Sequence, residues 1–120
     1  AGKYLDRLFA KLPCRYQGMF LEPDGTFPNH EADPSKVANL AALGERVRAS
    51  GAIAGFGLDG DGDRLGMVDE NGTPVRGDLL AALLSGDALR TAPGKPICYD
   101  LRSSKVLKEV IEAGGGRPQR

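Results

Sequence analysis

The sequence predicts an α/β fold in which a mostly parallel mixed sheet is flanked by helices. Segments with apolar residues at helical spacing alternate along the chain with short apolar runs that are typical of strands. One of these runs leads directly into an acidic, glycine-rich loop, and an Asn71-Gly72 pair that is typical of a tight hairpin follows soon after. Strands that alternate with helices are usually joined by crossover connections, which place them parallel in one sheet.

The first half of the chain is expected to hold two helices and two strands. Pro13 should end the first helix, and the Ser50-Gly51 pair should end the second, for which Asp33 or Ser35 is a candidate cap. In order, we expect a helix over residues 4–12, a strand over 15–22, a proline-rich loop over 23–34, a helix over 37–50 and a buried strand over 53–58.

The second half should begin with a β-hairpin after the acidic loop. We expect, in order, a strand over 65–69 folding back on 74–76, a helix from Asp78 to about residue 90, a strand over 97–101 and a helix over 105–113 capped by Ser103 or Ser104. The chain opens on a helix without a preceding strand and should close before the strand that would follow its last helix. We therefore expect a piece of a longer protein, truncated at both ends.

Composition excludes several classes of function. The 16 Lys and Arg residues balance 16 Asp and Glu residues, and no two basic residues are adjacent, so neither nucleic acid nor an anionic membrane surface is an expected partner. No apolar stretch approaches the roughly 18 residues that span a bilayer, and charges throughout residues 1–12 do not fit a signal peptide. Cys14 and Cys98 lack metal-ligand or redox spacing and should be reduced thiols, so we expect a cytoplasmic protein.

The acidic loop is the motif with the clearest chemical content. Asp59, Asp61 and Asp63 alternate with two glycines, and Arg64 follows. Glycine tolerates the unusual backbone angles that would turn alternate side chains toward one point. Two carboxylates about 5 Å apart repel by roughly 3 kcal/mol at an effective dielectric of about 20, and a divalent cation removes that cost. An all-oxygen ligand set suits Mg²⁺ or Ca²⁺ rather than zinc.

Other interpretations of this loop remain open. The three carboxylates could diverge into water as a solvated turn, and Arg64 could pair with Asp61 or Asp63 instead of binding phosphate. An EF-hand would need glycine in place of Arg64 and helices on both sides. A haloacid-dehalogenase-like phosphatase would use Asp59 as nucleophile in Asp-x-Asp-Gly, but it would lack the usual Thr or Val at position 63 and a later pair of acidic residues.

The loop resembles the metal-binding signature Asp-Gly-Asp-(Gly/Ala)-Asp-Arg of the α-D-phosphohexomutase family. The likeness covers essentially the whole chain, and the sequence Phe-Pro-Asn-His at 27–30 is similar to the phosphomannomutase/phosphoglucomutase branch. The other matching segments are Glu22 to Thr26, Asp33-Pro34, Asn39-Leu40, Leu65-Gly66, Val68-Asp69, Gly72 and Gly77-Asp78.

The resemblance implies a division of the chain into two parts. Residues 1–76 would form most of the family's domain 2, the metal-loop domain, without its first strand, and residues 77–120 would begin domain 3. The phosphoryl-carrying serine of domain 1 and the binding loops for sugar and phosphate would lie elsewhere. The piece alone should therefore be inactive, and its unpaired sheet edge should favour self-association.

The resemblance also implies a reaction and a role for each site residue. The family interconverts hexose 6-phosphates and hexose 1-phosphates of mannose and glucose through a phosphoserine and a bisphosphorylated sugar. Asp59, Asp61 and Asp63 would bind Mg²⁺ together with the phosphoserine, and Arg64 would act in catalysis by holding phosphate oxygens. Arg102, where the family usually has Lys, would be a second catalytic residue. A free-standing module that binds divalent cations, without enzymatic activity, is the alternative function.

Overall fold

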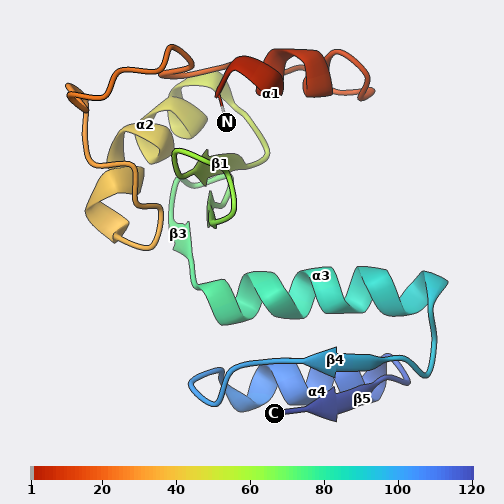
Figure 1. Cartoon of the computed structure of the whole chain (residues 1–120). Coiled ribbons are helices and arrows are strands. Elements are labelled where there is room, and N and C mark those ends of the chain that lie inside the picture. Colours follow the sequence, from red (N-terminus) through yellow and green to blue (C-terminus); the bar gives the residue numbers. More distant parts are fainter. Residues whose placement is uncertain (1) are drawn as a thin grey trace. The chain divides into compact units, whose positions relative to one another are not determined.

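The α/β class is confirmed by the computed structural model, which describes residues 2–120. The chain forms two compact units, one ending at Pro74 and the other running from Val75 to Arg120. The elements are α1 (Gly2–Phe9), η1 (Val37–Leu40), α2 (Ala41–Ser50), β1 (Gly55–Leu58), β2 (Leu65–Val68), β3 (Pro74–Val75), α3 (Gly77–Thr91), β4 (Pro96–Cys98), α4 (Lys105–Ala113) and β5 (Arg117–Gln119). Figure 1 labels all of them except η1 and β2. None of the described helices is long and apolar enough to cross a membrane.

The expected mostly parallel sheet is only partly confirmed. In the first sheet, ordered β1-β2-β3, β1 and β2 pair antiparallel, with Gly55 opposite Val68 and Leu58 opposite Leu65. The reason is the short connection between them, because residues 59–64 cannot make the crossover of about a dozen residues that parallel neighbours need. Parallel pairing does occur in the second sheet, between β4 and β5.

Helix α2 packs closely on one face of the first sheet because that face is built largely of glycines. A Cβ atom at Gly55 would come within 2.8 Å of the Val47 side chain of α2, and one at Gly57 within 2.9 Å of the Leu40 side chain, at the end of η1 just before α2. Leu40, Val47 and Val68 form the buried core between helix and sheet. Strand β1 is thereby fixed against α2 at the point where it leads into the acidic loop.

The predicted turn at Asn71-Gly72 is present and touches α2. The Gly72 amide donates to the Asp69 carbonyl oxygen at 2.9 Å, and Gly72 has a left-handed φ of 72°. A Cβ atom at Gly44 of α2 would lie only 2.5 Å from the Gly72 carbonyl oxygen. The hairpin that follows the acidic loop, formed by β2 and β3, is therefore held against the same helix as β1, which precedes the loop.

The predicted strand over residues 15–22 is wrong, because the chain there is irregular and mostly exposed. No strand of residues 2–120 lies beside this segment to complete its hydrogen bonds. Helix α1 ends earlier than expected, at Phe9, and none of its residues is buried. Its apolar stripe is only partly covered: Phe9 stacks on the Tyr16 ring, whereas Tyr4 is 71% and Leu8 53% exposed.

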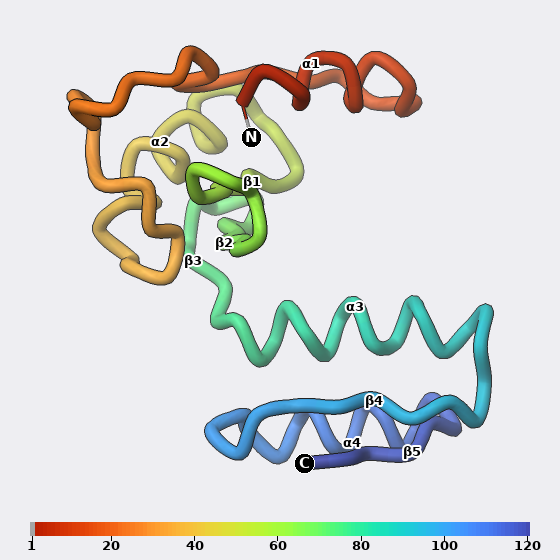
Figure 2. The backbone as a smooth tube through the Cα atoms, viewed as in Figure 1, coloured from red at the N-terminus to blue at the C-terminus, as the bar shows by residue number. Residues whose placement is uncertain are grey.

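The second unit packs two helices and a small sheet around its own core. Ala82 and Leu89 of α3 meet Leu107 and Ile111 of α4. Figure 2 traces the chain along β4, back through α4 and then beside β4 again as β5. The expectation that the chain closes before the strand after its last helix is wrong, because that strand is β5.

Asp78 connects the first turns of α3 and α4. Its carboxylate accepts hydrogen bonds from the Ser104 amide at 3.1 Å and from Arg76 Nη2 at 2.8 Å. Only 9% of the Asp78 side chain is exposed. Hydrogen bonding with Ser104 and the nearby Arg76 guanidinium hold the pKa of the Asp78 carboxyl below its usual value.

Replacement of Asp78 by Asn should therefore destabilise the second unit in a pH-dependent way. A carboxyl whose pKa is lower in the folded state stabilises the fold above its unfolded pKa of about 3.9, and this contribution is lost as the pH falls through the folded pKa. Asp78→Asn should lower the melting temperature at pH 7, and the difference from wild type should shrink toward pH 2.

The matched control is Asp87→Asn on the same helix, because Asp87 is exposed and its recorded ion pair within residues 2–120 is with Arg90, three positions along the helix. Melting curves followed by circular dichroism at several pH values would measure both variants. A constant difference between Asp78→Asn and wild type from pH 7 to pH 2 would contradict the assignment.

Candidate metal centre

The acidic loop begins at Asp59, which is buried directly after β1 with 5% of its surface exposed. One carboxylate oxygen, Oδ1, accepts the backbone amides of Gly62 at 2.9 Å and Arg64 at 3.2 Å. The Asp59 amide in turn donates to the Arg64 carbonyl oxygen at 3.4 Å. The loop therefore folds around the Asp59 side chain, whose hydrogen bonds fix the backbone positions of Gly62 and Arg64.

The three aspartates of the loop come together as the sequence predicts. One carboxylate oxygen from each of Asp59, Asp61 and Asp63 lies within 4.8 Å of the others. Opposite ligands of Mg²⁺ are about 4.2 Å apart and those of Ca²⁺ about 5 Å apart, given typical metal–oxygen distances. The donor chemistry and the spacing thus fit a hard divalent cation, and Asp61 and Asp63 are exposed to receive one.

Arg64 pairs with the acidic groups in a different pattern from the one expected. Its Nε lies 2.8 Å from Asp59 Oδ2 and its Nη1 lies 3.2 Å from Asp33 Oδ1, whereas Nε is 4.0 Å from Asp63 Oδ1. The alternative interpretation of the sequence paired Arg64 with Asp61 or Asp63, and of these two only Asp63 is recorded as an ion-pair partner, at the longest of the three distances. Asp33 was not anticipated as a partner of Arg64.

The single positive charge of Arg64 does not neutralise the negative charges of all three aspartates in the loop. The Arg64 hydrogen bond, the largest cause, holds the pKa of Asp59 far below its usual value. The pKa of Asp63 is instead raised, because its carboxyl shares a hydrogen bond with Asp59 and faces the charges of Asp61 and Asp59. The loop therefore keeps an excess of negative charge that a cation would neutralise.

The two glycines of the loop have different roles. Gly62 has a φ of 82°, which other residues rarely adopt, and its amide caps the Asp59 carboxylate. Gly60 is outside the set of positive-φ glycines, and a Cβ atom there would have no neighbour within 4 Å. The expectation of an unusual backbone at both positions therefore holds only for Gly62.

Arg102, the other predicted site residue, makes its contacts within the second unit. Its Nε and Nη2 donate to the two oxygens of Asp100 at 3.0 and 3.1 Å, and its amide donates to Asp100 Oδ1 at 2.7 Å. The side chain is 91% exposed. Arg102 is thus held in a defined orientation by a neighbour while its charge stays accessible to solvent.

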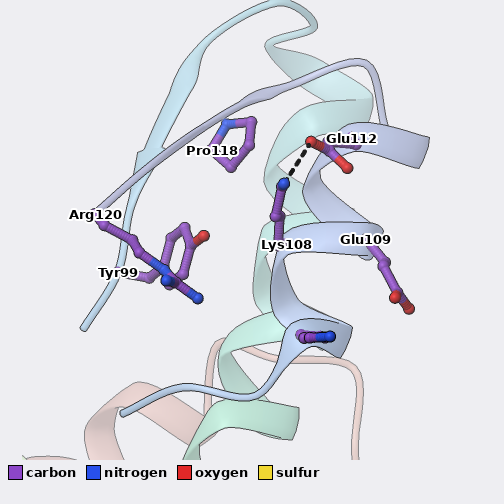
Figure 3. Close-up of a pocket in the computed structure, with 7 residues that line it drawn as sticks. Tyr99, Lys108, Glu109, Glu112, Pro118 and Arg120 are labelled. Carbon is purple, nitrogen blue, oxygen red and sulfur yellow. Dashed lines mark ion pairs between the residues drawn. The ribbon is translucent and has the colours of Figure 1, made fainter. Parts of the chain in front are cut away.

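An open hollow of about 610 Å³ in the second unit offers a different chemistry. Figure 3 shows Lys108 paired with Glu112 on α4, and Arg120 beside the Tyr99 ring. The Lys108–Glu112 ion pair measures 3.6 Å, and the Arg120 guanidinium carbon lies 5.7 Å from the centre of the ring. The residues that line the hollow include both basic and acidic side chains, and some of these are already paired. Its lining residues contain no cluster of three carboxylates like that of the acidic loop. The acidic loop therefore remains the candidate site.

Comparisons with known proteins find similar sequences and a similar fold. Residues 1–72 match the family model described as phosphoglucomutase/phosphomannomutase, alpha/beta/alpha domain II. A phosphomannomutase/phosphoglucomutase from Pseudomonas syringae pv. tomato is 41% identical over 98% of this chain and 25% of its own length. A phosphomannomutase from Methanocaldococcus jannaschii is 45% identical over 78% of this chain and 21% of its own length.

A solved structure agrees with these relatives. The crystal structure of a phosphoglucomutase/phosphomannomutase family protein from Burkholderia thailandensis superposes with a TM-score of 0.89 at 37% identity, covering 98% of this chain and 26% of that protein. The chain therefore spans about a quarter of the length of the curated relatives it matches.

Substitution of the two loop glycines by alanine should separate their roles. Gly62→Ala should lower the free energy of unfolding by about 1 to 2 kcal/mol, because a Cβ atom disfavours the left-handed backbone. Gly60→Ala should change it by less than about 0.5 kcal/mol. Urea unfolding followed by circular dichroism would compare the two variants, and equal losses would contradict the described loop geometry.

Proposed function

This chain belongs to the phosphoglucomutase/phosphomannomutase family, and from that premise we propose that it supplies the metal-binding portion of a hexose phosphate mutase. The enzyme would interconvert 6-phosphates and 1-phosphates of mannose or glucose. The observation that carries the proposal is the cluster of Asp59, Asp61 and Asp63 beside Arg64. The names of the relatives, phosphomannomutase and phosphoglucomutase, support the choice of substrate.

Asp59, Asp61 and Asp63 would hold Mg²⁺, each through one carboxylate oxygen. When bound, the ion would draw charge from a phosphoryl group during transfer. Asp59 would act as the fixed ligand because its backbone contacts and burial hold it in place. The exposed Asp61 and Asp63 would complete the set with small adjustments.

The arginines would bind the phosphate itself. The contacts of Arg64 with Asp59 and Asp33 use Nε and Nη1 and leave Nη2 to donate to a phosphate oxygen beside the metal. Arg102, held by Asp100, would be the second catalytic residue of the complete enzyme. A positive donor of this kind stabilises charge that develops in a transition state.

The rest of the reaction would depend on residues outside this chain. We infer that residues 1–76 form the metal-loop domain and residues 77–120 the beginning of the next domain. A phosphoserine, a bisphosphorylated sugar intermediate and the sugar-binding residues would belong to the remaining length that the relatives have. The enzyme would be cytoplasmic, in agreement with the two exposed free thiols at Cys14 and Cys98.

A phosphatase mechanism with Asp59 as nucleophile has less support, because the chain has Asp63 where such phosphatases have Thr or Val and lacks their later pair of acidic residues. A free-standing cation-binding module without mutase activity remains the alternative that the following experiment tests.

Asp61→Asn in the complete enzyme should lower kcat for glucose 1-phosphate at least about 100-fold, because a neutral amide is a weaker ligand for Mg²⁺. The matched control is Glu70→Gln, which removes one exposed carboxylate from the nearby hairpin turn and should stay near wild type. The 120-residue chain alone should show no turnover with Mg²⁺. A fully active Asp61→Asn enzyme would exclude the proposed ligand role.

The 120-residue chain should also associate with itself when isolated. Phe56 and Leu65 lie on the sheet face opposite α2 and are 51% and 43% exposed, and Tyr4 and Leu8 of α1 are exposed as well. Light scattering after size exclusion should give a mass that rises with concentration, and Phe56→Ser should reduce the effect. A monomeric mass over the whole concentration range would contradict this expectation.

A further inference from the structure

We propose that Asp33 is a positioning residue that orients the Arg64 guanidinium for phosphate binding, an inference that rests on the function proposed above for Arg64. The two residues are 31 positions apart, yet Arg64 Nη1 donates to Asp33 Oδ1 at 3.2 Å. The Asp33 side chain is 17% exposed and that of Arg64 is 56% exposed. A largely enclosed carboxylate thus holds one side of an accessible guanidinium.

Asp33 is itself fixed by its surroundings. Its Oδ1 also accepts the Ser35 hydroxyl at 2.6 Å and the Ser35 amide at 3.1 Å, while its carbonyl oxygen accepts Asn39 Nδ2 at 2.9 Å. The next residue, Pro34, is buried, and its carbonyl oxygen would be 2.7 Å from a Cβ atom at Gly66 of β2. The loop that carries Asp33 is therefore in close contact with the strand that follows the acidic loop.

Two contacts from different parts of the chain define the plane of the guanidinium. Asp59 Oδ2 holds Nε at 2.8 Å, and Asp33 Oδ1 holds Nη1. With Asp59 alone, the plane of the guanidinium could turn about the Nε–H···Oδ2 hydrogen bond. The position of Nη2 would then not be fixed. With both carboxylates the orientation of Nη2 is set in advance, which reduces the entropy lost when a phosphate oxygen binds.

The same loop offers a matched control in Asp24. Asp24 accepts the Thr26 amide at 2.9 Å and the Thr26 hydroxyl at 2.7 Å, which is the local turn that Asp33 makes with Ser35. No ion pair with an arginine is recorded for Asp24 in residues 2–120. Asp24→Asn therefore removes the turn carboxylate without touching Arg64.

The first test uses the nitrogen NMR signals of Arg64 in the ¹⁵N-labelled 120-residue chain, assigned by their loss in Arg64→Lys. Restricted rotation about the Nε–Cζ bond should give separate Nη1 and Nη2 signals in wild type and in Asp24→Asn. In Asp33→Asn these signals should merge, while the Val68 methyl signals report that the core stays folded. Merged signals in wild type, or separate ones in Asp33→Asn, would overturn the proposal.

The second test uses the complete enzyme with glucose 1-phosphate. Asp33→Asn should lower kcat/KM about 10-fold or more, Asp33→Glu should recover part of that loss, and Asp24→Asn should stay within about 2-fold of wild type. An active Asp33→Asn enzyme together with an inactive Asp61→Asn enzyme would refute the positioning role and leave the mutase proposal intact. An active Asp61→Asn enzyme would refute the mutase proposal itself.

Discussion

The ion pair between Asp59 and Arg64 is the interaction on which the candidate site depends. It places a carboxylate in a buried position at the end of β1 and compensates its charge within the same loop. Burial of a carboxylate without an oppositely charged partner costs free energy. The Gly62 and Arg64 amides donate hydrogen bonds to the Asp59 carboxylate, but they do not neutralise its charge. With Asp59 fixed, the loop presents Asp61 and Asp63 toward the same point.

Helix α2 and strands β1 and β2 hold the two ends of the acidic loop close together. Glycines on one sheet face let α2 approach β1 closely, and the contact between Gly44 and Gly72 holds the hairpin against the same helix. Strands β1 and β2 are therefore kept in antiparallel register on either side of the loop. The excess negative charge lies in a segment whose two ends are held by paired strands, which is a suitable arrangement for a cation site.

Features that depend on neighbouring residues could be predicted from the sequence, and features that depend on distant partners could not. The Asn71-Gly72 turn and the convergence of the three aspartates follow from local backbone chemistry. The strand expected over residues 15–22 needed a partner strand, and residues 2–120 provide none beside it. The contact between Asp33 and Arg64 joins two loops that no spacing pattern relates, so only the folded chain reveals it.

The most direct test of the proposed metal centre is to locate the position at which a divalent cation binds to this chain. Crystals of the 120-residue chain soaked in Mn²⁺, which has anomalous scattering and shares the oxygen preference of Mg²⁺, would locate it. We expect an anomalous difference peak coordinated by Asp59, Asp61 and Asp63, and no such peak in Asp61→Asn crystals. Full occupancy of Mn²⁺ at another place in the chain, with the acidic loop unchanged, would contradict this expectation.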